Sequence, residues 1–279
     1  MSASTEPGLA GETDPALPDP LMPVLELDRV SKVYPGSPAV RALDEVSLAV
    51  LPGELTAIVG PSGSGKSTLL QVLSGLHAPD DGEVLFNLRD GGVHDIYRLT
   101  EGRRRALTRT DWGLVHQSAA DGLRMNVSAG ANVVERPMAL GERHYGRLRR
   151  LALEWLERVE IDPSRIDDTP ATFSGGMRQR LQIARNLVTL PRLVFLDEPT
   201  SGLDVSVQAR LLDLLRQLTR QLGLAAVLVT HDLAVARLLA DRMMVMQGGR
   251  VVEAGLTDQL LDDPSHPYTQ LLVASVLPP

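Results

Sequence analysis

The stretch of sequence that decides the fold reads Gly60-Pro61-Ser62-Gly63-Ser64-Gly65-Lys66-Ser67. It fits the pattern G-x-x-x-x-G-K-[ST], in which a glycine-rich loop turns its backbone N–H groups toward phosphate oxygens. The apolar run Leu55–Val59 before it predicts a buried strand, and Thr68–Leu73 after it predicts a helix that stops at Gly75. Strand, loop and helix form the context that the pattern requires. We therefore predict a nucleotide-phosphate site rather than a chance glycine- and serine-rich turn.

The residues of this loop have separate expected parts in binding. Its three glycines allow sharp turns and close approach of the backbone to phosphate, and the helix start adds a favourable dipole. Lys66 can reach the β- and γ-phosphates, and the Ser67 hydroxyl can ligate Mg²⁺. We expect the whole stretch through Thr68 to contact the nucleotide.

Composition excludes several classes of protein. The chain has 279 residues, of which 43% are hydrophobic and 23% charged, as in ordinary globular proteins. Its net charge of −7 argues against a mainly nucleic-acid-binding protein, and no apolar run is long enough for a membrane span. Cysteine is absent, which excludes disulfides and Cys-ligated metal centres and fits a reducing compartment such as the cytoplasm. The start of the sequence has neither the basic nor the apolar region of a signal peptide.

The first part of the chain predicts an extension and a small antiparallel sheet. Residues 1–22 are rich in Pro, Gly, Ser, Thr and acids, and we predict a disordered extension. The apolar pattern predicts strands over Val24–Val33 and Val40–Val50, which lie close enough in sequence to pair antiparallel. Tyr34 follows the first strand. Its ring could stack on a base or could be a half-buried strand aromatic, and the sequence alone favours neither.

The middle of the chain combines a short strand with a helical region. Trp112–Val115 predicts a strand that ends at His116-Gln117. Gln117 thus lies where open α/β sheets bind ligands, and it could ligate Mg²⁺ or position a water molecule. Residues 118–124 are expected to form a loop, and residues 127–159 show a helical pattern that is broken at 141–146. We predict a separate helical subdomain over about residues 118–172.

Another glycine-rich turn follows at Phe173–Met177. Ser174 is a good N-cap residue, and Gly175 and Gly176 expose backbone N–H groups at the start of the next helix. The turn is either a simple cap or a second anion-binding helix terminus.

The apolar strand Leu193–Glu198 ends in two carboxylates. A strand of this kind is buried on both faces, as in a parallel sheet. Asp197 can hold Mg²⁺ opposite Ser67, and Glu198 can polarise the attacking water as a base. Two acids beside a phosphate loop are less well explained as caps of the next helix.

The remaining pattern completes a single predicted nucleotide-binding domain. Residues 201–204 turn into a helix that runs to about Leu222, and Ala225–Val229 predicts a buried strand that ends at Thr230-His231. His231 is a candidate for γ-phosphate contact at the end of that strand. Residues 243–247 and 250–254 predict a hairpin. We place the domain over residues 23–255 and a helical tail over residues 256–279.

The order of these motifs resembles that of the ATP-binding cassette (ABC) ATPases. The segments that carry the resemblance are Gly60–Ser67, Gln117, Phe173–Met177, Leu193–Glu198, Ser201–Asp204 and His231. The resemblance implies an α/β P-loop NTPase with a RecA-like core, an antiparallel β-subdomain and an inserted helical subdomain. It also implies Mg²⁺-dependent ATP hydrolysis by a head-to-tail pair of cassettes, expected to be two copies of this chain. The ATP would lie between the phosphate loop of one copy and the Ser174-Gly175-Gly176 turn of the other.

The same resemblance assigns roles to single residues. Tyr34 matches the residue that stacks on adenine, Glu198 the catalytic glutamate and His231 the switch histidine. Asp204 matches a residue that crosses the dimer interface. The sequence departs from the common Leu-Ser-Gly-Gly-Gln signature at its first and last positions, Phe173 and Met177, whereas the backbone N–H groups and the Ser174 hydroxyl that would contact ATP remain.

A narrower resemblance points to the K subunit of bacterial carbon–phosphorus lyase systems. It rests on residues 116–117, 121–124, 127–130, 143–146, 173–177 and 204–215. This resemblance implies that the cassette docks on a soluble phosphonate-degrading lyase core. An ATPase of an oligopeptide-type importer is the alternative, since residues 266–269 resemble that group. A module that binds ATP without hydrolysing it is a third possibility, against which the acidic pair and His231 argue.

Overall fold

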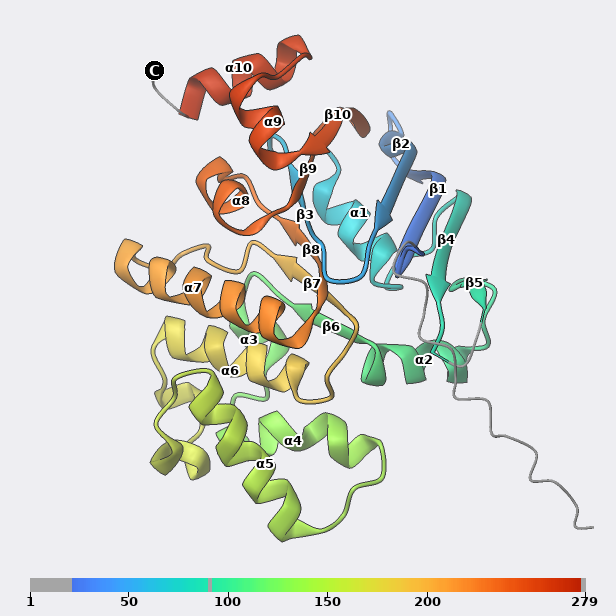
Figure 1. The fold of residues 1–279 in the computed structure, drawn as a ribbon. Helices are drawn as coiled ribbons and strands as arrows, with labels where there is room; N and C mark the ends of the chain where they lie inside the picture. Colours follow the sequence, from blue (N-terminus) through green and yellow to red (C-terminus); the bar gives the residue numbers. More distant parts are fainter. Residues whose placement is uncertain (1–21, 90–91, 277–279) are drawn as a thin grey trace, which may run out of the picture.

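The computed structural model describes residues 22–89 and 92–276, which form two sheets with helices around them (Figure 1). Apart from Met22, the extension predicted over residues 1–22 lies outside the described residues, as do the last three residues of the tail. The smaller sheet has the strand order β2-β1-β4-β5 and the larger one the order β10-β9-β3-β8-β7-β6. The strands are β1 Leu25–Tyr34, β2 Val40–Val50, β3 Leu55–Val59, β4 Asp81–Asn87, β5 Val93–Asp95, β6 Trp112–Val115, β7 Leu193–Asp197, β8 Ala225–Val229, β9 Arg242–Gln247 and β10 Arg250–Leu256.

The larger sheet is parallel except for its last strand. Strands β3, β6, β7, β8 and β9 run parallel, and β10 pairs antiparallel with β9. Every residue of β3 and β8 is buried, because helices or the smaller sheet cover both faces. This arrangement confirms the predicted buried strands and the hairpin at residues 243–254.

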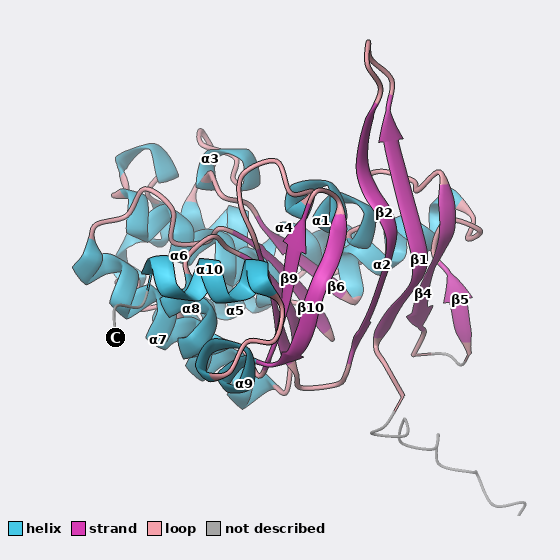
Figure 2. Ribbon diagram, turned by 90° about the horizontal axis from the view of Figure 1, so that it is seen from above, coloured by secondary structure: helices cyan, strands magenta, loops and turns pink. Residues whose placement is uncertain are grey.

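The helices lie around this sheet in two layers. Their bounds are α1 Lys66–Leu73, α2 Glu101–Thr110, α3 Ala119–Gly122, α4 Ala129–Ala139, α5 Tyr145–Arg158, α6 Gly175–Leu187, α7 Val205–Leu222, α8 Leu233–Leu239, α9 Thr257–Asp262 and α10 Pro267–Val276, with 3₁₀ turns η1 Pro163–Asp167 and η2 Pro170–Thr172. Helix α1 packs in an apolar core between the two sheets (Figure 2). Helices α6, α7 and α8 cover the other face of the larger sheet.

The smaller sheet stands beside α1 and is antiparallel throughout (Figure 2). The predicted pairing of the first two strands is confirmed, with Leu25 opposite Val50 and Tyr34 opposite Val40. Tyr34 is therefore the last residue of β1, at the end of the sheet nearest the phosphate loop.

The helical region differs from the sequence-based expectation in two details. The predicted loop at residues 118–124 contains the short helix α3, since its alanines favour helix after Ser118 in an extended conformation. The break between helices covers residues 140–144 instead of 141–146, because the His144 side chain caps α5 and lets Tyr145 begin it. The apolar core of this region is continuous with that of α6 and the larger sheet.

Candidate active site

The phosphate loop joins β3 to α1 with a backbone that only glycine adopts easily. Gly60, Gly63 and Gly65 have φ of 151°, 78° and 104°. A Cβ on Gly65 would lie 2.3 Å from the Ala42 carbonyl oxygen, so any other residue would push the smaller sheet away. Gly65 also occupies the N-cap position of α1, and within the described chain no side chain caps this helix. Its first N–H groups are thus available to a ligand.

Lys66 is folded back into the loop. Its Nζ donates to the carbonyl oxygens of Gly60, at 2.7 Å, and Pro61, at 2.8 Å. Burial lowers the pKa of Lys66, while the charges of Glu198 and Asp197 act in the opposite direction. Nearby, the buried Ser64 Oγ has no hydrogen-bond partner among the described residues. A buried cation and an unsatisfied hydroxyl in one loop are typical of a site completed by an anion.

A cavity of about 720 Å³ opens above this loop. Its size suits a nucleotide-sized ligand. Loop residues, the end of the first sheet and the ends of two strands line it: Tyr34, Val40, Arg41, Ala42, Ser62, Gly63, Gly65, Lys66, Ser67, Thr68, Glu198, His231 and Gly248.

Some of these lining residues were not predicted. Arg41 and Gly248 reach the cavity from β2 and the β9–β10 turn, and no motif in the sequence marked either position. The Gly248-Gly249 turn was predicted only as part of a hairpin. Its proximity to the loop depends on how the hairpin packs, with Gly249 N–H donating to the Ser64 carbonyl.

The two predicted carboxylates lie at the end of β7. Burial, followed by the charge of Glu198, raises the pKa of Asp197. Glu198 has a left-handed backbone, with φ of 39°, and its N–H donates to the Val229 carbonyl at 2.9 Å. Strained backbone of this kind concentrates at functional sites, because the surrounding structure must hold it in place.

Two other predicted polar residues, Gln117 and His231, each contact one carboxylate oxygen of Glu198. Gln117 Nε2 donates to Glu198 Oε2 at 3.3 Å and to Ser201 Oγ at 3.1 Å. His231 Nδ1 lies 3.0 Å from Glu198 Oε1. These three residues follow the neighbouring strands β6, β7 and β8, whose carboxyl ends meet at one edge of the sheet. The structure therefore brings Gln117, Glu198 and His231 together, as the sequence predicted for strand ends of this kind.

The donor set fits Mg²⁺ held jointly with phosphate. Among residues 22–89 and 92–276, no three His, Cys, Asp or Glu side chains form a cage for a metal ion. Mg²⁺ does not need one, since it binds one or two protein oxygens together with water and phosphate oxygens. Ser67, Asp197 and Gln117 offer a hydroxyl, a carboxylate and an amide oxygen. A divalent cation would also offset the raised pKa of Asp197.

The second glycine-rich turn lies outside this cavity. Ser174 caps α6 by accepting a hydrogen bond from Met177 N–H at 3.3 Å. The turn packs on the start of α7, where a Cβ on Gly176 would lie 2.4 Å from Val207 Cγ1. Asp204 caps α7 in the same way, at 3.0 Å from Val207 N. In the described structure, the predicted residues thus form two groups, one around the cavity and one around the starts of α6 and α7.

Comparison with known proteins identifies the family. The family model described as ABC transporter matches residues 43–201. The chain belongs to the ABC ATPases. It is therefore an ATPase that binds ATP with Mg²⁺, and both the predicted P-loop fold and the predicted activity are confirmed. No helix within residues 22–89 and 92–276 is long and apolar enough to cross a membrane.

Two relatives make this assignment more specific. The chain is 59% identical to PhnK of Escherichia coli (strain K12), an ATP-binding protein whose provisional name refers to phosphonates utilization. That match covers 91% of this chain and 98% of PhnK, and it confirms the resemblance to the phosphonate group. The dipeptide transport ATP-binding protein DppF of the same organism is 38% identical over 93% of this chain and 77% of DppF.

A solved structure confirms the architecture. The dimeric ATP-binding cassette MJ0796, bound to ADP and Pi in a post-hydrolysis state, has a TM-score of 0.74 and 31% sequence identity. The similarity covers 84% of this chain and 98% of that one. Cassettes of this family form dimers, which agrees with the location of the α6 turn away from its own cavity.

Proposed function

We propose that this protein is the ATP-hydrolysing cassette of a phosphonate-degrading system and that it transmits hydrolysis to a carbon–phosphorus lyase core. The observation that carries the ATPase mechanism is the cluster in which Gln117 and His231 hold Glu198 beside the Lys66 cavity. The similarity to PhnK supports the phosphonate system. The proposal implies a cytoplasmic location, where ATP and the lyase would be available.

The geometry suggests a role for each group. Lys66 would leave the Gly60 and Pro61 carbonyls and bind the β- and γ-phosphates, with the N–H groups of the loop. Tyr34 would stack on the base at the cavity rim. Mg²⁺ would neutralise charge on the phosphates, held by Ser67, Asp197 and Gln117. Glu198 Oε2 would take a proton from the attacking water, while His231 contacts the γ-phosphate and orients the carboxylate through Oε1.

Two copies would be needed to close the site. The α6 turn and the Asp204 cap of α7 lie together, outside the cavity that their own chain forms. The turn therefore stays free to contact a nucleotide that is bound in the cavity of a second cassette. We propose a homodimer in which Ser174, Gly175 and Gly176 of each copy contact the ATP bound to the other.

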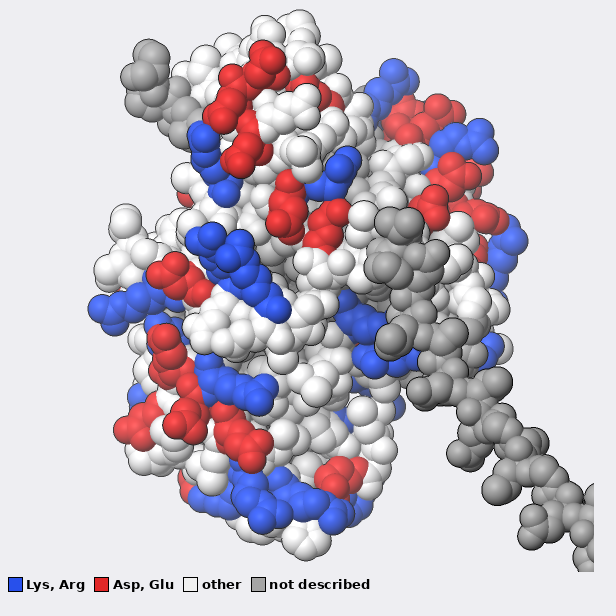
Figure 3. Space-filling model, viewed as in Figure 1, with Lys and Arg blue, Asp and Glu red and all other residues white. Residues whose placement is uncertain are grey.

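The segment from Ser118 to Arg124 is the proposed contact with the lyase core. It follows Gln117 directly, so movement of Gln117 reaches it first. Asp121 is exposed, whereas Arg124 pairs with Glu135 at 2.8 Å. Substituting Asp121 is therefore the simpler test, because its side chain forms no ion pair within residues 22–89 and 92–276. Figure 3 shows both acidic and basic side chains on the face in view, and the net charge of −7 argues against nucleic acid as the main partner.

The test is to purify the tagged protein from its host and identify what is bound to it. Lyase subunits in the eluate would support the proposal. A membrane permease in their place would support the importer that the DppF similarity offers as the alternative. Asp121→Ala should weaken lyase binding and leave ATP affinity unchanged, while Asp258→Ala, an exposed acid on α9, serves as the control. Equal lyase binding by both variants would exclude this segment as the contact.

A further inference from the structure

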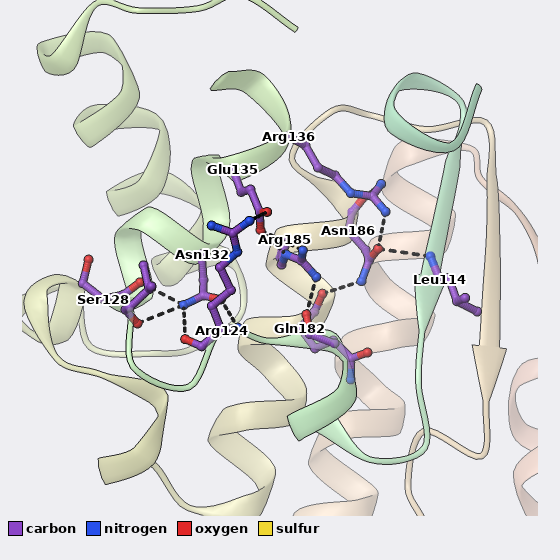
Figure 4. A network of polar contacts seen from close by, with 11 residues as sticks. Leu114, Arg124, Ser128, Asn132, Glu135, Arg136, Gln182, Arg185 and Asn186 are labelled. Atoms are coloured by element: carbon purple, nitrogen blue, oxygen red, sulfur yellow. Dashed lines mark hydrogen bonds and ion pairs between the residues drawn. The ribbon is translucent and has the colours of Figure 1, made fainter. Parts of the chain in front are cut away.

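Strand β6 is an edge strand, yet its free edge is not left to solvent. It pairs with β7 on one side only, because it ends the order of the larger sheet. Unpaired N–H and C=O groups on such an edge need other partners. Side chains of α6 and α4 supply them here, and Figure 4 shows the bond from Leu114 N–H to Asn186 of α6.

Two amide side chains of α6 accept from alternate N–H groups of this edge. Asn186 Oδ1 accepts from Leu114 N–H at 3.1 Å, and Gln182 Oε1 accepts from His116 N–H at 2.6 Å. Four helical residues rise about 6 Å, and two strand residues about 6.6 Å. Amides four positions apart on a helix thus match N–H groups two positions apart on a strand. Helix α6 therefore pairs with β6 much as a neighbouring strand would.

The pairing is tightest at His116, next to Gln117. Besides accepting from the N–H group, Gln182 donates from Nε2 to the His116 carbonyl at 3.1 Å. Gln179 Nε2 donates to the same carbonyl at 3.1 Å, and Gln182 Nε2 lies 3.3 Å from Gln179 Oε1. Gln182 is 0% exposed and Gln179 3% exposed, so water cannot replace these bonds. Both the N–H and the carbonyl group of His116 are therefore hydrogen-bonded to side chains of α6.

The chain leaves room for these amides at both ends. A Cβ on Gly122 would lie 2.3 Å from Gln182 Oε1, and one on Gly113 would lie 3.3 Å from Asn186 Cβ. At the Leu114 end, Arg136 of α4 donates to the Trp112 carbonyl at 2.7 Å. It also donates to Asn186 Oδ1 at 2.7 Å (Figure 4). Among the described residues, the side chains that bond the His116 backbone come from α6 alone, whereas those at the Leu114 end come from α6 and α4.

We propose that Gln182 is a positioning residue for ATP hydrolysis, which fixes Gln117 against Glu198 by holding the His116 backbone on α6. The proposal rests on the proposed role of Gln117. It makes the Ser174 turn, α6, the end of β6 and Gln117 one rigid unit. Gln117, which contacts Glu198 in the ATP site of its own copy, then moves together with the Ser174 turn, which contacts the ATP bound to the second copy.

The test compares Gln182→Met with Asn186→Leu, both of which replace a buried amide by an apolar side chain of similar size. Gln182→Met removes two hydrogen bonds to the β6 edge and Asn186→Leu removes one, so both should lower the melting temperature. Only Gln182→Met should lower kcat, by about tenfold, with the KM for ATP changed less than twofold. Asn186 holds Leu114, which lies two residues farther from Gln117 than His116 does. Asn186→Leu should therefore keep the wild-type kcat.

A double variant separates positioning from general loss of structure. If Gln182 acts through Gln117, then Gln117→Ala/Gln182→Met should have the kcat of Gln117→Ala alone. Multiplied losses, or equal kcat losses in Gln182→Met and Asn186→Leu, would overturn the proposal. So would a folded Gln182→Met with wild-type kcat. These outcomes leave the Glu198 assignment untouched, because normal turnover in Glu198→Gln is the result that would overturn that part of the proposed function.

Discussion

The two glycine-rich turns of this chain begin helices in different ways. Helix α1 starts after Gly65, and within the described chain no side chain caps it. Helix α6 starts after Ser174, whose hydroxyl accepts from Met177 N–H. The first turn lines a cavity formed by its own chain, and the second lies against α7 outside that cavity.

This difference indicates where each turn finds its ligand. An uncapped helix start with a buried lysine is incomplete until an anion binds, so α1 depends on nucleotide to satisfy its N–H groups. A capped helix start is stable by itself and can stay exposed until a partner arrives. We infer that the start of α1 binds ATP within one copy and that the start of α6 contributes to the pairing of two copies.

The largest expected effect comes from Glu198→Gln, which should leave both turns intact and remove only the base. We expect kcat to fall by about a thousandfold while ATP still binds, since general bases contribute on the order of 10²–10⁴-fold. Saturating ATP should then hold the protein as a dimer, measured by light scattering. Turnover at the wild-type rate would show that Glu198 is not the base.

Lys66→Ala tests phosphate binding at the start of α1. ATP affinity should fall by at least about a hundredfold, because two charge-assisted hydrogen bonds to phosphate are lost, at roughly 1.5–3 kcal/mol each. Equilibrium binding of a fluorescent ATP analogue measures the change. Affinity within a few-fold of wild type would mean that the lysine does not reach the phosphates.

Ser174→Ala tests the part of the α6 turn in pairing two copies. ATP affinity of the monomer should stay unchanged, whereas ATP-dependent dimerisation in the Glu198→Gln background should weaken by roughly tenfold, because one hydrogen bond to nucleotide is lost. The lost cap also costs about 1 kcal/mol of unfolding free energy. Ser128→Ala removes the cap of α4, where Ser128 Oγ accepts from Ala131 N–H, and is the matched control. Equal loss of dimerisation in both variants would mean that Ser174 acts only as a cap.

Tyr34→Leu distinguishes the contribution of base stacking to ATP binding from that of the phosphate contacts. The KM for ATP should rise by about fivefold, since stacking on an exposed ring contributes about 1 kcal/mol. Tyr34→Phe should be close to wild type, because the hydroxyl contacts only His77 Nδ1 at 3.2 Å in the described chain. If both variants lose affinity equally, the hydroxyl rather than the ring is responsible.

Some of the site could be predicted because its signals are local. The Gly60–Thr68 loop, the Asp197-Glu198 pair and the Ser174 cap each lie within one short segment next to a recognisable strand or helix. Gln117 and His231 were also predicted, since both follow apolar strands and such strand ends meet at one edge of a parallel sheet. The short helix α3 was not predicted, because one helical turn leaves almost no periodicity to detect.

The sequence by itself determined the order of strands and helices, the phosphate loop and the acidic pair, because spacing along the chain controls each of them. Only the tertiary structure decided that Arg41 and Gly248 line the cavity and that Gln182 and Asn186 complete the edge of β6. These residues act across long separations, 66 residues from His116 to Gln182 and 72 from Leu114 to Asn186. Their roles depend on which groups two packed elements leave unpaired. That is a property of the surface between α6 and β6, and no single segment of the sequence contains it.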